Sequence, residues 1–222
     1  NVFISGPAGV GKSLVVKKIL EECAARKRLC VLTAPTGAAA VNIGGQTLHS
    51  FFGLGPLRYL SDFKRYMWGK KRAIRSTDIL VIDEVSMLSG MMFDALELGV
   101  ACIRASPERL GSRMAAGSNR GTNQTGGRNK STAFTEDTLR KRWQMPTPTG
   151  ENRQLEGGFG DLEPWGGMQL VIVGDFFQLP PVNIIQKKPW DASELQLGKG
   201  LPFQQWGFAF ESEAWWKSPR RC

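Results

Sequence analysis

One short segment near the start of the chain has the residue types and spacing of a phosphate-binding loop. The pattern G-x-x-x-x-G-K-[ST] is matched in full by Gly6, Pro7, Ala8, Gly9, Val10, Gly11, Lys12 and Ser13. Glycines let successive backbone N–H groups turn toward phosphate oxygens, a lysine reaches the β- and γ-phosphates, and a serine hydroxyl binds Mg²⁺. The alternative is a glycine-rich turn that precedes a lysine by chance. We predict instead that these eight residues bind ATP, that Lys12 also acts in catalysis, and that Ser13 is a Mg²⁺ ligand.

Two adjacent acids and a glutamine follow two apolar runs farther along the chain. Asp83 and Glu84 come directly after residues 79–82, and ligands of parallel sheets bind where strands end. Asp83 is predicted to hold Mg²⁺, and Glu84 to take a proton from the attacking water. Gln178 lies in a segment that follows the apolar run at 169–173. A glutamine there can form hydrogen bonds to the γ-phosphate and to the attacking water, so we predict that Gln178 is a catalytic sensor. The alternative is an ordinary turn that is terminated by two prolines.

The elements that must position these residues can be predicted from the spacing of apolar side chains. Runs rich in Val, Ile or Leu occur at residues 2–5, 29–33, 79–82 and 169–173, and they are typical of buried parallel strands. Apolar residues three and four apart predict a helix over 13–28, so the loop joins a strand to a helix in a βαβ unit. Further helices are expected over 89–105 and within 57–75. The predicted fold class is α/β, with a parallel β-sheet flanked by helices.

The stretch 106–163 differs in composition, because its 58 residues contain no Val and no Ile. Such a segment buries too little apolar surface to order itself, and we predict a flexible insertion between two parts of one domain, 1–105 and 164–222. No run of 18 uncharged apolar residues occurs, so no membrane span or membrane partner is expected. Four cysteines without a CxxC pair and one histidine predict neither a disulfide framework nor a zinc cluster, and a reducing compartment is expected.

The net charge of +9 is concentrated in residues 57–77, which hold seven Lys or Arg and one Asp. An anionic polymer is a natural partner for such a surface, although a solvated helix has the same composition. A second candidate contact with nucleic acid is the segment 33–53, where small residues begin a helix. His49, Phe51 and Phe52 could offer stacking faces to bases, and one of the two phenylalanines is expected to be buried.

Four segments, taken in this order, resemble the petite-integration-frequency (PIF) family of ATP-dependent DNA helicases. They are GPAGVGKS at 6–13, APTGAAAVNIGGQTLHSFFG at 34–53, IDEVSML at 82–88 and GDFFQLPPV at 174–182, and FAFESEAWW at 208–216 is also similar. The resemblance implies a RecA-like P-loop NTPase domain of a superfamily-one, 5′-to-3′ enzyme with ATP and Mg²⁺ as cofactors. Val10 departs from the Thr or Ser common in the family, but its backbone N–H is still available.

The resemblance also implies partners and further site residues. Contacts with single-stranded DNA would come from Pro35, Thr36, Gly37, Thr47, His49 and Phe51. Duplex junctions would be a second DNA partner, and a second RecA-like domain of the parent chain would complete the ATP site. Roles in DNA repair, recombination or telomere maintenance, in the nucleus or mitochondrion, would follow. The chain begins in an apolar run without Met, so we expect a fragment, with the family's adenine-reading glutamine before residue 1.

Two other functions are compatible with parts of this pattern. The chain could belong to a P-loop ATPase that acts without unwinding DNA, or to a nucleotide-dependent DNA-binding module. Gln178 and the segment 47–52 argue against the first alternative. The intact set of Lys12, Ser13 and the acids argues against the second.

Overall fold

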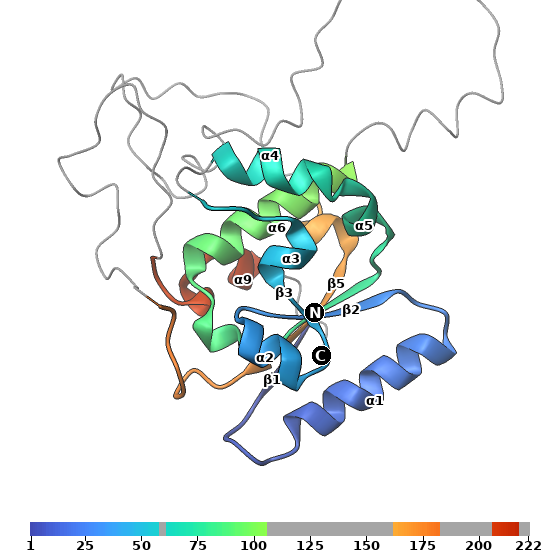
Figure 1. Ribbon diagram of the computed structural model, residues 1–222, viewed down its shortest axis with the longest axis vertical. Helices are drawn as coiled ribbons and strands as arrows, with labels where there is room; N and C mark the ends of the chain where they lie inside the picture. Colours follow the sequence, from blue (N-terminus) through green and yellow to red (C-terminus); the bar gives the residue numbers. More distant parts are fainter. Residues whose placement is uncertain (58–60, 106–161, 183–205, 218–222) are drawn as a thin grey trace, which may run out of the picture.

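The parallel sheet that the sequence predicts forms the centre of the molecule (Figure 1). In the described residues it has five strands, one more than the four apolar runs predict. The computed structural model describes residues 1–57, 61–105, 162–182 and 206–217, so the predicted insertion lies almost entirely outside the described residues. The strands are β1 Val2–Ser5, β2 Cys30–Ala34, β3 Gln46–Thr47, β4 Ile79–Ile82 and β5 Gln169–Gly174. Their order in the sheet is β1-β5-β4-β2-β3.

The two faces of the sheet are covered by different helices. Val81, Val171 and Val173 pack with Val16 of α1, which runs over Lys12–Ala25. The alternating residues of β4 and β5 point the other way and join the larger core around α6, which runs over Gly90–Ala105. Figure 1 shows α1 on one side of the sheet and α6 with α4 and α5 on the other.

The larger core is built around α6, whose residues from Gly90 to Ile103 are all buried. The other helices are α2 Gly37–Asn42, α3 Leu48–Phe52, α4 Ser61–Gly69, α5 Lys71–Ser76 and α9 Glu213–Lys217, with short 3₁₀ turns η1 Val85–Met87, η4 Pro164–Gly167 and η6 Ala209–Glu211. Phe63, Met67 and Ile74 of α4 and α5 are fully buried, so the basic stretch has an apolar side in the core. In the described part of the chain, no helix has the length and hydropathy needed to cross a bilayer.

Helix α1 ends three residues before the predicted boundary at residue 28. The N–H of Arg28 bonds to the carbonyl of Cys23 at 2.9 Å, and that of Lys27 bonds to Ala24 at 3.0 Å. Lys27 has a left-handed φ of 53°, so these bonds form a Schellman cap with lysine where glycine is usual. The prediction was wrong at this end because the usual glycine signal is missing.

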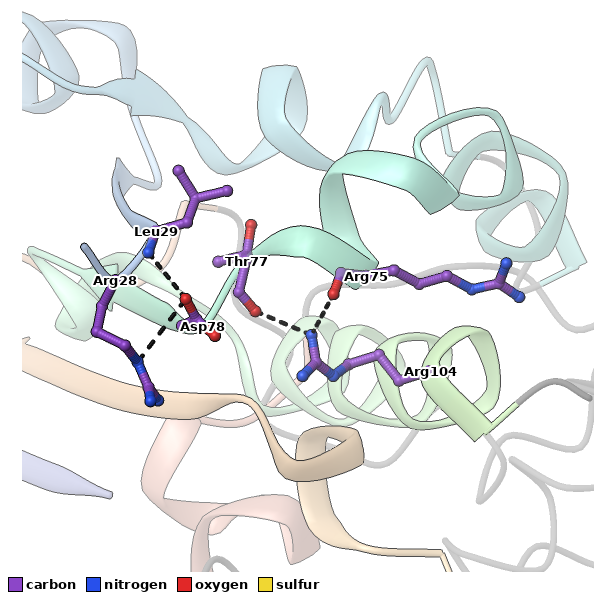
Figure 2. Close-up of polar contacts among 6 residues, drawn as sticks. All are labelled: Arg28, Leu29, Arg75, Thr77, Asp78 and Arg104. Carbon is purple, nitrogen blue, oxygen red and sulfur yellow. Dashed lines mark hydrogen bonds and ion pairs between the residues drawn. The ribbon is translucent and has the colours of Figure 1, made fainter. Parts of the chain in front are cut away.

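The two chain segments that flank residues 106–161 are bonded to each other. Arg104 Nε, near the end of α6, donates to the carbonyl of Gly166 at 2.8 Å, and Figure 2 shows its guanidinium at the end of α5. Trp165 is fully buried, and Leu162 packs against the larger core. Leu162, two residues before the predicted start of the second part of the domain, therefore already contacts the core.

Candidate functional site

The glycine-rich loop joins β1 to α1, where the sequence predicts it. Gly9 and Gly11 have φ values of 80° and 95°, which glycine adopts without strain. The carbonyl of Gly11 accepts hydrogen bonds from the N–H groups of Leu14 and Val15 at 3.0 and 3.2 Å, which starts the helix. The N-terminus of a 14-residue helix therefore opens at the loop, and its free N–H groups favour an anion.

Lys12, the first residue of α1, folds its side chain back across the loop. Its Nζ donates to the carbonyl oxygens of Gly6 at 2.6 Å and Pro7 at 3.0 Å. The loop's own backbone thus holds the ammonium group in place. A positive charge is fixed where a phosphate group in the loop would meet it.

One cavity of about 370 Å³ brings most of the predicted nucleotide residues together, whereas Gly6, Pro7 and Val10 are not part of its lining. It is lined by Ala8, Gly9, Gly11, Lys12, Ser13, Asp83, Glu84 and Gln178. These residues come from the three loops that follow β1, β4 and β5 at their carboxyl ends, and from the first turn of α1. The spatial grouping expected from the sequence is therefore present.

A larger cavity of about 680 Å³ lies at the other ends of the strands. Its lining includes Ile79 and Gln169, the first residues of β4 and β5, together with Ile19 and Cys23 of α1. None of the predicted site residues lines it. The smaller cavity is therefore the candidate site.

Burial and like charges act on the two acids of the smaller cavity. Burial raises the pKa of Asp83, and the Glu84 N–H, which donates to Asp83 Oδ1 at 2.9 Å, acts in the opposite direction. The pKa of Glu84 is raised by burial first, and then by the negative charges of Asp83 and Asp175. Lys12 lowers both pKa values but does not cancel the increase. A raised pKa suits a carboxylate that must accept a proton.

The same acids fit a magnesium ion. Mg²⁺ in nucleotide sites is usually held by one or two protein oxygens together with phosphate oxygens. Asp83 is largely buried, Ser13 lines the same cavity, and the mutual repulsion of the acids would be relieved by a cation. Within the described ranges, no group of three or more His, Cys, Asp or Glu is placed to hold a metal ion. A site shared between protein and phosphate therefore agrees with this donor set better than an all-protein one.

Gln178 is held by its neighbour Asp175, a residue that the sequence analysis missed. Gln178 Nε2 donates to Asp175 Oδ2 at 3.0 Å, and the backbone N–H of Gln178 donates to the Asp175 carbonyl at 3.0 Å. Asp175 is 8% exposed. The only sequence signal was its position directly after the strand, three residues before the glutamine.

The two segments predicted to contact DNA lie side by side at one edge of the sheet. β2 and β3 pair in parallel, with Ala34 opposite Thr47, so the chain leaves both strands at the same end. Thr36 and Thr47 begin α2 and α3, and their hydroxyls accept hydrogen bonds from Ala39 N at 3.3 Å and Ser50 N at 3.1 Å. The predicted segments 35–37 and 47–51 are therefore neighbours.

The prediction of a stacking face at Phe51 is wrong in this structure. Phe51 is 4% exposed and Phe52 is fully buried, with their rings edge to face at a centroid distance of 4.7 Å. Leu48, Phe51 and Phe52 have the spacing of one helical face, and α3 packs that face on the core. His49 lies on the exposed side of α3, and partial burial lowers its pKa. Of the aromatic residues in α3, only His49 remains available to a base.

Comparison with known proteins agrees with this geometry. Residues 1–115 match the family model described as PIF1-like helicase. The chain is 31% identical to the ATP-dependent DNA helicase PIF1 of Saccharomyces cerevisiae over 222 residues, which are 97% of this chain and 18% of that protein. The crystal structure of Pif1 helicase from Candida albicans superposes with a TM-score of 0.56 and 27% identity, covering 100% of this chain and 35% of that one.

A further solved relative, Pif1 helicase from Bacteroides in complex with ADP-AlF3 and ssDNA, gives a TM-score of 0.53 at 25% identity. The alignment covers 98% of this chain and 36% of that one. The chain thus spans about a fifth of the length of the curated relatives it matches. The family model covers more than half of the chain, and the fold is that of the RecA-like domain of solved relatives. The chain belongs to the PIF1-like helicase family.

Proposed function

We propose that this chain is the first RecA-like domain of an ATP-dependent 5′-to-3′ DNA helicase, and we call the longer protein that contains it the parent protein. The parent protein would couple Mg-ATP hydrolysis to movement along single-stranded DNA and to duplex unwinding. DNA repair, recombination and telomere or replication maintenance, in the nucleus or mitochondrion, are the proposed settings. The observation that carries the proposal is the single cavity that joins the phosphate loop, both acids and Gln178.

The residues around this cavity can be assigned complementary roles. The N–H groups of residues 8–13 and the Lys12 ammonium would bind the phosphates, and Ser13 with Asp83 would hold Mg²⁺. The bound ion would supply positive charge against the phosphate oxygens. Glu84 would accept the proton of the attacking water, because its raised pKa makes it a stronger base than an ordinary carboxylate. Gln178 would contact the γ-phosphate and that water.

A second RecA-like domain of the parent protein is proposed to complete the ATP site. Arginines from that domain would stabilise charge on the transferring phosphoryl group, and such residues are worth roughly 10³-fold or more in rate. We therefore expect the isolated chain to bind Mg-ATP but to hydrolyse it at least about a thousandfold more slowly than the parent protein. Single-turnover hydrolysis by the two proteins makes this comparison.

Single-stranded DNA is proposed to bind along the segments 35–37 and 47–51. The support is their adjacency at the edge of the sheet and the exposed position of His49. Backbone contacts to phosphates would dominate, so affinity should fall with salt and depend little on base sequence. The alternative surface is formed by α4 and α5, where Arg65, Lys70 and Arg72 are exposed opposite the buried apolar side.

Hydrolysis and unwinding by the parent protein test the proposed function. Lys12→Ala should lose ATP binding, whereas Glu84→Gln should bind ATP and fail to hydrolyse it. The wild-type protein should unwind a duplex with a 5′ single-stranded tail and not one with a 3′ tail. Hydrolysis without unwinding of either duplex would favour the non-unwinding ATPase. DNA binding without hydrolysis would favour the binding module.

Two glycines allow a matched test of the DNA-binding surface. A Cβ at Gly37, the first residue of α2, or at Gly69, the last residue of α4, meets no atom within 4 Å. Gly37→Asp and Gly69→Asp therefore each add one negative charge to one candidate surface without a steric clash.

Fluorescence anisotropy on an oligothymidine can compare these two variants of the parent protein. Gly37→Asp should weaken binding about tenfold through repulsion of the phosphates, and Gly69→Asp less than about twofold. The opposite ranking would assign DNA binding to α4 and α5.

A further inference from the structure

Asp175 uses its whole carboxylate within the loop that carries Gln178. Oδ1 accepts the Phe177 N–H at 3.0 Å, and Oδ2 accepts Gln178 Nε2 at 3.0 Å. The Asp175 carbonyl also accepts the Gln178 N–H at 3.0 Å. Asp175 is absent from the lining of the nucleotide cavity, whereas Gln178 is part of it. This geometry therefore suggests that Asp175 affects the nucleotide site through Gln178 rather than by direct contact.

The chemistry of the contact determines which way the Gln178 amide faces. An ionised carboxylate has only acceptors, so the amide atom that lies 3.0 Å from Asp175 must be the nitrogen. Rotation of the amide by 180° would bring its oxygen against the carboxylate. A charge-assisted hydrogen bond would be exchanged for a repulsion, so the rotated form should be populated about tenfold less or lower. Asp175 is 8% exposed and Gln178 is exposed, so water screens this preference less than it would between two surface groups.

We propose that Asp175 is a positioning residue that holds the amide of Gln178 in one orientation, with its carbonyl oxygen and one N–H left for the reaction. The inference rests on the proposed function, in which Gln178 contacts the attacking water and the γ-phosphate. The carbonyl oxygen can accept a hydrogen bond from the water, and the remaining N–H can donate to a phosphate oxygen. An amide that rotates freely would offer the wrong group to each partner for part of the time.

The base of this loop is fixed against the turn that carries Glu84. A Cβ at Gly174 would lie 3.0 Å from both Cγ1 and the backbone nitrogen of Val85, a tight contact that a larger residue could make only if Val85 shifted by a few tenths of an ångström. Val85 follows Glu84 and is fully buried. The loop therefore starts from a rigid point beside the proposed base, and the contact with Asp175 sets the remaining freedom of the Gln178 side chain.

Steady-state ATP hydrolysis by the parent protein with saturating single-stranded DNA tests the proposal. The asparagine of Asp175→Asn can present either its oxygen or its nitrogen to Gln178, so it no longer favours one orientation of the Gln178 amide. We expect kcat to fall about tenfold while KM for ATP changes less than about twofold, because the amide orientation matters in the transition state. In a Gln178→Ala background, Asp175→Asn should have no further effect on kcat, since the group it positions is gone.

Asp94→Asn is the matched control, because it removes another buried carboxylate that does not line the cavity. Asp94 is fully buried and accepts the Ala214 N–H at 2.7 Å at the start of α9. Its effect on kcat should be small and the same with and without Gln178. Asp175→Asn with wild-type kcat, or with an undiminished effect in the Gln178→Ala background, would overturn the proposal.

Gln178→Glu provides a second test if Asp175→Asn does not fold. Gln178 is exposed, so glutamate is tolerated there, but its carboxylate cannot donate to Asp175. We expect kcat as low as that of Gln178→Ala; because this change also removes the N–H assigned to the phosphate, wild-type activity would overturn both the inference and the role proposed for Gln178. A wild-type parent protein without DNA-stimulated hydrolysis would instead refute the proposed function, whatever the variants do.

Discussion

Replacing Arg104 by methionine should destabilise the fold strongly, because one guanidinium joins three parts of the structure. Arg104 Nε donates to the carbonyl of Gly166 in η4. Its Nη1 lies 3.0 Å from the carbonyl of Ile74, 3.2 Å from that of Arg75 and 2.9 Å from that of Thr77, at the end of α5 (Figure 2). Methionine retains most of the aliphatic stem, so the change removes mainly the polar contacts.

The expected cost follows from the kind of contact. A hydrogen bond to a charged group contributes about 1.5 to 3 kcal/mol, and a buried carbonyl left without a donor costs about 1 to 3 kcal/mol. The three carbonyls at the end of α5 share the single nitrogen Nη1, so their three contacts together are treated as one full hydrogen bond. With the bond from Nε this makes two hydrogen bonds, whose removal should lower the free energy of unfolding by about 3 kcal/mol. For a domain of 150 to 250 residues, this lowers Tm by about 6 to 12 °C.

Arg28→Met is the control in the same region of the structure. Arg28 Nε lies 3.7 Å from Asp78 Oδ2, and both side chains are largely exposed, at 54% and 40% (Figure 2). Such a pair contributes at most about 1 kcal/mol, and Asp78 retains its bond from the Leu29 N–H at 2.9 Å. Thermal unfolding of the two variants, followed by circular dichroism, compares the losses. A shift of less than about 2 °C for Arg104→Met, or an equal loss for Arg28→Met, would refute the reasoning.

Three further predictions concern other parts of the chain. Replacing residues 106–161 by a short Gly-Ser linker should leave Tm within a few degrees, because Arg104 already joins the flanking segments; a fall of more than about ten degrees in a circular dichroism melt would contradict this. Burial, assisted by the neighbouring Cys23, raises the pKa of Cys30 to about 12, so alkylation at pH 8 should be about a thousandfold slower than for an ordinary thiol; peptide mass spectrometry measures it, and rapid labelling would disprove it. Asp83→Asn, measured in EDTA, should raise Tm by a few degrees at pH 7, because the folded state raises the pKa of Asp83 and so disfavours its ionised form. This gain in Tm should shrink as pH falls through the folded pKa and vanish below the unfolded pKa, where Asp83 is protonated in both states. A gain that persists at that pH would argue against this cause.

Four of the five described strands, and the grouping of the predicted nucleotide residues, could be predicted because their signals are local, whereas β3 has only two residues and was not predicted. β1, α1 and the loop between them are contiguous, and β4 ends directly before Asp83. The end of α1 was missed for an equally local reason, since Lys27 occupies the left-handed position where glycine is expected. The contacts of Arg104 could not be predicted, because they depend on how α5, α6 and η4 meet in three dimensions.

Within the candidate DNA segment 47–51, the prediction of stacking residues was wrong. Aromatic residues next to each other at 51 and 52 gave no indication of which ring faces the core, because α3 was not predicted as a separate helix. Once Thr47 is recognised as the N-cap, the spacing of Leu48, Phe51 and Phe52 identifies the buried side. The assignment of stacking residues therefore depends on finding the helix start first.

The order of the strands explains how residues distant in sequence could act together. β5 lies between β1 and β4, so the loop with Gln178 emerges between the phosphate loop and the acids, although it comes last in the chain. β2 and β3 follow β4 in the sheet, which places the candidate DNA segments on the far side of the acids. A displacement of Gln178 would therefore affect the turn after Asp83 before it could affect those segments. Because a Cβ at Gly174 would lie only 3.0 Å from Val85, the two segments are closely packed, and we expect this turn to be the first element that a change at the nucleotide displaces.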